Sequence, residues 1–340
     1  MTGMLTDLTV VWALLIAFAV FAYVALDGFD LGVGMLFATT ADKGERDVMM
    51  NSVAPVWDGN ETWLIMGGGG LFAAFPLAYA LILPALYVPL VLMLLALVFR
   101  GVAFEFRWRP GRLRPFWDAS FIAGSAVATF MQGACLGALL QGIAVDEAAR
   151  SFAGHWLDWL SPFSVLTGVA LMTGYALLGA TWLVLKTEGA LNARMRRIAT
   201  GLAVATVGFI GVVSLATPFL QEGYYNRWFV GLGIVLAVLV GAAVLATGWA
   251  LVRSLRETRR DWPPFVLAIG LFALCFVGLG VCMWPYAVPT EITIWEAAAP
   301  RSSQLFMLVG AGVLIPVILG YTAYAYWVFR GKVDPEAGYH

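Results

Sequence analysis

Histidine is almost absent from this chain. Its 340 residues include only two histidines, His155 in a polar connection and His340 at the end, and neither lies in an apolar segment. Because histidine is a common axial ligand of haem iron, we expect no His-ligated haem here. The three cysteines, Cys135, Cys275 and Cys282, lie in apolar segments and form no CxxC pair. They are expected to be buried apolar side chains, with Cys275 and Cys282 as a soft-metal pair the weighed alternative, so we predict no metal site and no disulfide framework.

Charged residues are also scarce. Only 12% of the residues are charged and 61% are hydrophobic, with a formal net charge of -1. A soluble domain averages about 25% charged and about 45–50% apolar residues. The composition is that of a polytopic membrane protein, and it gives no reason to expect a nucleic-acid partner.

Long apolar runs are abundant. A membrane-spanning helix needs about 20 apolar residues, and nine segments meet this requirement. The stretch from Ser52 to Phe106 is too long for one span, and Pro84 and Pro89 suit a turn and a helix start within it. The sequence therefore predicts an all-α membrane protein with nine transmembrane helices in a single integral domain, residues 1–340. The predicted spans are 8–37, 52–82, 83–106, 116–143, 162–185, 198–220, 228–252, 264–287 and 304–329.

The distribution of Lys and Arg predicts the orientation of these spans. Sixteen of the 20 basic residues follow odd-numbered spans, whereas only Arg150, Arg227 and Arg301 follow even-numbered ones. Because connections rich in Lys and Arg stay in the cytoplasm, the N-terminus is expected in the periplasm and the C-terminus in the cytoplasm. The segment before the first span holds no Lys or Arg, which agrees with this orientation and argues against a cleaved signal peptide.

Six charged side chains fall inside the first three predicted spans. An ionisable group in a membrane costs at least about 2.5–3.5 kcal/mol on insertion scales, so each needs a partner, water or a proton. The predicted topology places all six toward the cytoplasmic third of three consecutive helices. They are Asp27, Asp30, Asp58, Glu61, Arg100 and Glu105.

These charges support two interpretations. In the first, Arg100 and Glu105 belong to an ion-pair network that holds the three helices together. In the second, the four other carboxylates, Asp58, Glu61, Asp30 and Asp27, outnumber the one buried cation and retain protons that they pass along. Asp58 and Glu61 are three residues apart and share a helix face, as do Asp27 and Asp30. We adopt the second interpretation, a proton-uptake path from the cytoplasm.

Small and amide residues predict helix contacts. Gly28 and Gly32, four residues apart in the first span, allow the backbone of another helix to approach closely. Gln132 and Gln141 in the fourth span are expected to form interhelical hydrogen bonds rather than to bind a ligand.

Four ordered blocks of sequence carry a family resemblance. They are LDGFDLGVG at 26–34, APVWDGNETW at 54–63, GGGLFAAFP at 68–76 and FRGVAFE at 99–105. Together they resemble subunit II of the bacterial cytochrome bd-type quinol oxidases, including the cyanide-insensitive branch. The blocks cover about the first third of the chain, and the remainder matches in span count, the lone ninth helix and loop sizes.

The resemblance implies a fold of two four-helix bundles plus one peripheral helix, packed against a similarly folded subunit I. Subunit I would carry two b-type haems and one haem d and would bind quinol, so this chain is expected to be haem-free, without catalytic residues or a cofactor of its own. The complex would oxidise ubiquinol or menaquinol and reduce O2 to water in the respiratory chain of the bacterial inner membrane. The resemblance leaves room for a structural quinone, bound lipid and a small single-span accessory subunit.

The resemblance also assigns roles to residues. The position that matches Asp58 belongs to a proton path from the cytoplasm toward the haems of subunit I. Asp30 is a weaker candidate for the same path. Apart from the resemblance, we expect Trp57, Arg100 and Glu105 to be structural or ion-pair residues near this path.

Two other functional classes are compatible with intramembrane carboxylates. A proton-coupled secondary transporter should contain discontinuous helices in corresponding positions of its two halves, and only the second span is Gly-rich. A purely structural scaffold subunit would tolerate the loss of every carboxylate. The oxidase subunit is preferred because it alone explains the ordered set of blocks.

Overall fold

The computed structural model describes residues 7–109, 112–146 and 148–334, so His340 lies outside it. Within these ranges, eight helices are long and apolar enough to cross a membrane. The first is preceded by Asp7, whose side chain caps the helix by accepting a hydrogen bond from the Thr9 backbone N–H. The eight helices are α1 (Leu8–Leu36), α5 (Tyr87–Phe106), α6 (Arg114–Gln141), α7 (Pro162–Lys186), α8 (Gly189–Ala216), α10 (Leu232–Arg256), α11 (Trp262–Met283) and α13 (Arg301–Val328).

The predicted second span is two consecutive helices, α3 (Trp57–Ala74) and α4 (Pro76–Ala85). The helix breaks at Phe75, which has a non-helical backbone with φ -130° and ψ 61°. Pro76 causes the break, because the residue before a proline is excluded from helical geometry while a proline itself fits a first helical turn. Each of the other predicted spans overlaps one of the eight long helices.

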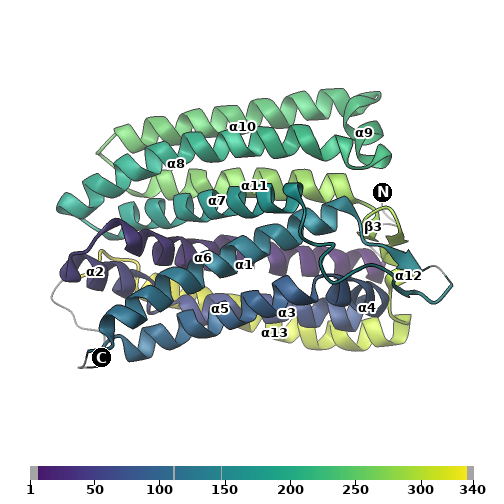
Figure 1. Ribbon diagram of the computed structural model, residues 1–340, viewed down its shortest axis with the longest axis horizontal. Helices are drawn as coiled ribbons and strands as arrows, with labels where there is room; N and C mark the ends of the chain where they lie inside the picture. The colour runs from purple at the N-terminus through teal and green to yellow at the C-terminus, as the bar shows by residue number, and fades with distance from the viewer. Residues whose placement is uncertain (1–6, 110–111, 147, 335–340) are drawn as a thin grey trace.

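The long helices form two bundles and a peripheral helix. Helices α1, α3–α4, α5 and α6 pack together, as do α7, α8, α10 and α11, and α7 joins the bundles by packing on α1 and α6. Helix α13 lies beside α1 and α3 at the edge of the first bundle (Figure 1). The arrangement of two bundles plus one peripheral helix is therefore confirmed.

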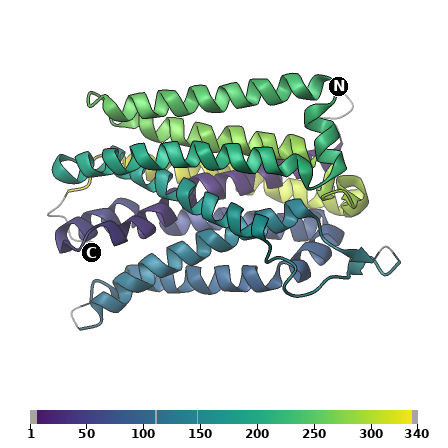
Figure 2. The ribbon, with the colours of Figure 1, turned by 45° about the horizontal axis from the view of Figure 1, so that its top comes forward.

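Short elements close the two ends of the molecule. We call these the α2 end, where α1 ends, and the α9 end, where α1 begins. Figure 2 shows a small β-hairpin extending beyond the helices at the α9 end. The short elements are η1 (Phe37–Thr39), α2 (Lys43–Val53), β1 (Val145–Asp146), β2 (Ser151–Phe152), η2 (Thr217–Phe219), α9 (Glu222–Phe229), β3 (Tyr286–Val288), β4 (Ile292–Thr293) and α12 (Ile294–Ala297). Strand β1 pairs with β2 and β3 with β4, both antiparallel.

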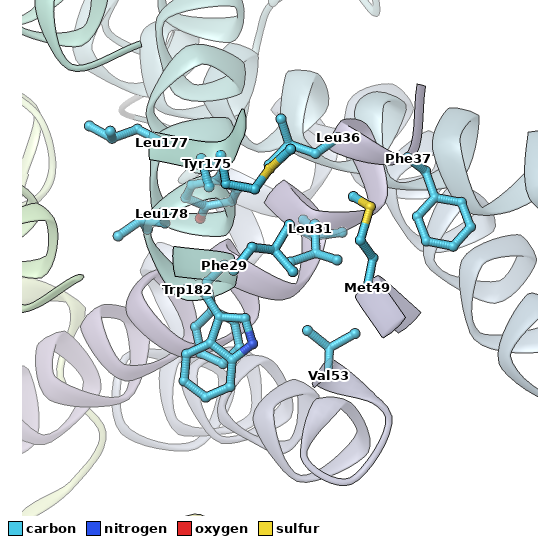
Figure 3. Close-up of a cluster of buried hydrophobic side chains, with 14 of the residues drawn as sticks. Phe29, Leu31, Leu36, Phe37, Met49, Val53, Tyr175, Leu177, Leu178 and Trp182 are labelled. Atoms are coloured by element: carbon cyan, nitrogen blue, oxygen red, sulfur yellow. The ribbon is translucent and has the colours of Figure 1, made fainter. Parts of the chain in front are cut away.

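Close packing of α1 on α7 joins the two bundles. A Cβ atom added to Gly32 would lie 1.9 Å from the Tyr175 carbonyl oxygen, so only glycine fits there. The predicted close helix approach is thus confirmed at Gly32. Nearby, the Phe29 ring of α1 stacks on the Trp182 ring of α7 with centroids 4.2 Å apart. These side chains lie in the main apolar cluster, together with Val53 at the end of α2 (Figure 3).

Candidate functional site

A buried arginine lies at the centre of the charged residues in the first bundle. Arg100 of α5 is fully buried, and its Nη1 atom lies 2.6 Å from a Glu61 oxygen of α3 and 3.0 Å from an Asp27 oxygen of α1. Its Nη2 atom lies 3.8 Å from an Asp30 oxygen, one helical turn after Asp27. Two helices, α1 and α3, thus bring three carboxylates to the one guanidinium of α5.

Two aromatic rings cover the same arginine. Trp57 of α3 and Phe104 of α5 stack with centroids 4.6 Å apart and planes 4° from parallel. The Arg100 guanidinium lies over both rings, 5.9 Å and 5.8 Å from their centroids. Cation–π contacts of this kind favour the charged form and exclude water from one side of the site. Trp57 therefore lies next to Arg100.

Carboxyl groups outnumber cationic groups in the site. Asp27 and Asp30 are fully buried, and they share the one guanidinium of Arg100 with Glu61. Neither Asp27 oxygen makes a hydrogen bond of good geometry, although Tyr23 lies beside this carboxyl one helical turn earlier. An uncompensated charge in a low-dielectric interior costs several kcal/mol, whereas a protonated carboxyl group does not incur this cost. The site is therefore suited to accept and release protons.

An asparagine connects the buried carboxylate Asp30 to the peripheral helix. The Asn60 amide of α3 donates a hydrogen bond to Asp30 over 2.8 Å, and a longer one of 3.4 Å to the Leu26 carbonyl. The Tyr326 hydroxyl of α13 donates to the Asn60 side-chain oxygen over 2.9 Å. Neither Asn60 nor Tyr326 was predicted to belong to the site, and the one sequence signal was the position of Asn60 between Asp58 and Glu61.

The fourth predicted span contributes a polar link between the bundles. Gln132 of α6 donates to the Tyr23 hydroxyl of α1 over 2.8 Å and accepts from the Tyr175 hydroxyl of α7 over 3.0 Å. The predicted interhelical role of Gln132 is confirmed. Gln141 accepts a hydrogen bond from the Ser161 hydroxyl, which precedes α7.

Asp58 lies apart from the buried group. Its side chain is exposed, and the ion pairs of Arg100 involve Glu61, Asp27 and Asp30 instead. Exposed residues recur on α3 at intervals of three or four, which defines one outward face of the helix. We call this the α3 outer face; its residues are Asp58, Thr62, Ile65, Gly69 and Phe72.

Glu105 is exposed near the end of α5, and within the described ranges it forms no ion pair. A residue five positions after Arg100 is turned by about 140° around the helix, so the two side chains point in different directions. Glu105 therefore does not belong to the ion-pair network around Arg100, whereas Arg100 does.

A second charged cluster at the α2 end was not predicted. Arg107 is fully buried, with its Nε atom 2.5 Å from Asp118 of α6 and its Nη1 atom 2.7 Å from Asp47 of α2. Arg46 of α2 also pairs with Asp118 at 2.8 Å, and Arg114 pairs with Asp47. This cluster fixes α2 against α5 and α6. In the part of the chain that the structure describes, no group of three or more His, Cys, Asp or Glu is suited to a metal ion.

Comparison with known proteins gives consistent matches over nearly the whole chain. The family described as cytochrome bd terminal oxidase subunit II matches residues 8–329. Cytochrome bd-I ubiquinol oxidase subunit 2 of Escherichia coli (strain K12) is 32% identical, over 96% of this chain and 95% of the relative. Cytochrome bd ubiquinol oxidase subunit 2 of Bacillus subtilis (strain 168) is 31% identical, over 95% and 96%. A chain in the structure of bd oxidase from Geobacillus thermodenitrificans shares the fold, with a TM-score of 0.76 and 16% identity over 95% of this chain and 99% of that one.

Proposed function

The chain belongs to the family of cytochrome bd terminal oxidase subunit II, and we propose that its role in the oxidase includes a proton-uptake path from the cytoplasm. It is a subunit of a respiratory quinol oxidase, an oxidoreductase complex, and a multi-pass protein of the bacterial inner membrane. Subunit II implies a partner subunit I.

The observation that carries the proposal is the position of Glu61. Its side chain is 26% exposed, whereas that of Arg100, 2.6 Å away, is fully buried. On α3, Glu61 is one turn from Asp58, which lies on the outer face. Glu61 thus joins an accessible carboxylate to the buried carboxylates Asp27 and Asp30 around Arg100. We propose that protons pass between these buried carboxylates and Asp58 by way of Glu61.

The excess of carboxylates gives this arrangement its chemistry. One guanidinium among three carboxylates leaves the site short of positive charge, so protons compensate the remainder. A carboxyl group that gains and loses a proton without moving far is a suitable relay for protons crossing an apolar interior. Arg100, held by Trp57 and Phe104, keeps the carboxylates together.

The outward position of Asp58 indicates where protons leave this chain toward subunit I. An ionised side chain facing lipid inside a span costs at least about 2.5 kcal/mol, so we infer that subunit I covers the α3 outer face. We place the haems b and d in subunit I, because the described spans of this chain contain no histidine. The α2 end, where the charged groups gather, is then the cytoplasmic end. A structural quinone, bound lipid and a small accessory subunit stay compatible with this arrangement.

The test is turnover of the purified two-subunit oxidase carrying Asp58→Asn, which keeps the size of the side chain and removes its titratable proton. We expect full assembly with intact haems and O2 consumption reduced about tenfold or more from pH 6 to 8. Glu105→Gln is the matched control, because Glu105 is also an exposed carboxylate near the α2 end and is not paired with Arg100. Wild-type turnover in assembled Asp58→Asn would refute the relay, and equal losses in both variants would show a general charge effect.

A further inference from the structure

Helix α13 is peripheral over most of its length. Among its residues only Gln304 is buried, and large apolar side chains are exposed along it. Near its last turn, however, Tyr326 turns toward the first bundle. Its ring makes edge contacts with Phe29 of α1 and Trp182 of α7, with centroids 6.5 Å and 6.2 Å apart. Tyr326 therefore lies where α1, α7 and α13 meet.

The hydroxyl of Tyr326 and the Leu26 carbonyl together favour one orientation of the Asn60 amide. A hydroxyl donates to the amide oxygen, so the amide N–H groups point the other way. In the structure they point at Asp30, with the Asn60 nitrogen 2.8 Å from a carboxylate oxygen. The reversed amide would place its oxygen against that carboxylate, which is repulsive unless Asp30 carries a proton. By donating to the amide oxygen, the Tyr326 hydroxyl stabilises, together with the Leu26 carbonyl, the orientation in which Asn60 donates to an ionised Asp30.

The segment after α13 holds Tyr326 in place. The Lys186 ammonium at the end of α7 donates to the Phe329 carbonyl. Lys332 forms an ion pair with Asp261, between α10 and α11, at 2.5 Å. These contacts fix the chain just beyond the last turn of α13 to the second bundle. Tyr326 thus reaches Asn60 from an anchored position.

We propose that Tyr326 is a positioning residue of the proton path: through its hydrogen bond to Asn60 it keeps the amide N–H groups directed at Asp30. This inference rests on the proposed function, and it adds a residue of the ninth predicted span to a path otherwise formed by α1, α3 and α5. The peripheral helix thereby takes part in the function of the buried site.

The test uses Tyr326→Phe, which keeps the ring and its contacts with Phe29 and Trp182 and removes only the hydroxyl. The matched control is Tyr324→Phe, because Tyr324 lies on the same helix and is 63% exposed. In the purified oxidase, we expect about two- to tenfold slower turnover for Tyr326→Phe, the effect of one lost hydrogen bond, and no change for Tyr324→Phe. In an Asn60→Ala background, the same Tyr326→Phe change should have no further effect on turnover.

Infrared difference spectroscopy reports directly whether Asp30 is protonated. The carboxyl stretching band removed by Asp30→Asn should persist to higher pH in Tyr326→Phe than in wild type, and be unchanged in Tyr324→Phe. If Asp30→Asn does not assemble, Asp30→Glu identifies the band by its shift instead.

Three results would overturn the inference. One is an unchanged band in Tyr326→Phe. Another is an equal loss of turnover for Tyr326→Phe with and without Asn60. The third is failure of Tyr326→Phe to assemble, which would assign the hydroxyl to structure. If Asp30→Asn assembled and turned over normally, the role of Asp30 in the proposed path would fail. The pH dependence of the band would still decide whether Tyr326 orients Asn60 toward Asp30.

Discussion

Arg100 and Asp27 lie 3.0 Å apart, and neither side chain is exposed. Removing one partner of a buried ion pair costs about 3–5 kcal/mol, because the other charge is left uncompensated. The two partners are not equivalent here. Without Asp27, Arg100 keeps Glu61 and Asp30, whereas without Arg100 three carboxylates have no cation.

We therefore predict that Arg100→Met abolishes assembly of the two-subunit oxidase, whereas Asp27→Asn assembles with a lowered midpoint of thermal unfolding. The yield of haem-loaded complex after size-exclusion chromatography measures both effects. Normal assembly of Arg100→Met would show that the cluster is not held by this arginine.

The contact of Gly32 with α7 gives a second prediction. Gly32→Ala places a Cβ atom 1.9 Å from the Tyr175 carbonyl oxygen, so α1 and α7 must separate. We expect a loss of at least about 1–3 kcal/mol in the free energy of unfolding, the typical cost of overpacking. Gly208→Ala is the control, since nothing lies within 4 Å of its added Cβ atom. Thermal unfolding in detergent should separate the two variants, and equal midpoints would contradict the close packing.

The anchor beyond α13 predicts a dependence of stability on pH. Burial alone would raise the pKa of the Asp261 carboxyl, but hydrogen bonds and charge from Lys332 and Arg196 hold this pKa below its ordinary value of 3.8. The carboxylate therefore stabilises the folded state above about pH 4, and this contribution is lost as the pH falls through the folded-state pKa. Asp261→Asn should lower the unfolding midpoint at pH 7, and the difference from wild type should shrink below about pH 4. A difference that stayed constant down to pH 3 would contradict the ion pair.

The cluster at the α2 end predicts a role for α2 in stability. Arg107→Met leaves Asp47 and Asp118 with only the partly exposed Arg114 and Arg46. We expect α2 to detach more readily, so that limited proteolysis cleaves α2 at Lys43 and Arg46 faster than in wild type. Arg109→Met is the control, because the Arg109 guanidinium lies over the exposed Phe106 ring and forms no ion pair with any residue that the structure describes. Equal cleavage rates in both variants would show that Arg107 does not hold α2.

Local sequence patterns predicted the membrane-spanning helices, because long apolar runs and the distribution of basic residues act within single segments. The gathering of Asp27, Asp30 and Glu61 around Arg100 also followed, since few ionisable groups exist in the spans and each needs a partner. Local patterns did not predict which way each helix face turns. The spacing of Asp58 and Glu61 predicted that they lie near each other on α3, but not that Asp58 points outward. The rotation of α3 about its axis is set by the helices packed against it.

Contacts between distant segments were also not predicted. Tyr326 and Asn60 are 266 positions apart, and a tyrosine near the end of an apolar helix is ordinary at a membrane interface. The Arg107 cluster depends on α2, a polar helix that no apolar run marked. In both cases the partners become neighbours only once the helices are packed.

The most direct test of the proton path is the rate of proton uptake in a single turnover. Fully reduced oxidase is mixed with O2 in weakly buffered solution, and a pH-indicator dye and the oxygen-binding haem are followed together. In Asp58→Asn, we predict that oxygen binds at the wild-type rate while proton uptake from solution, and the haem step that requires it, slow together by about tenfold or more. Proton uptake at the wild-type rate in an assembled Asp58→Asn enzyme would contradict the path through Asp58 and Glu61.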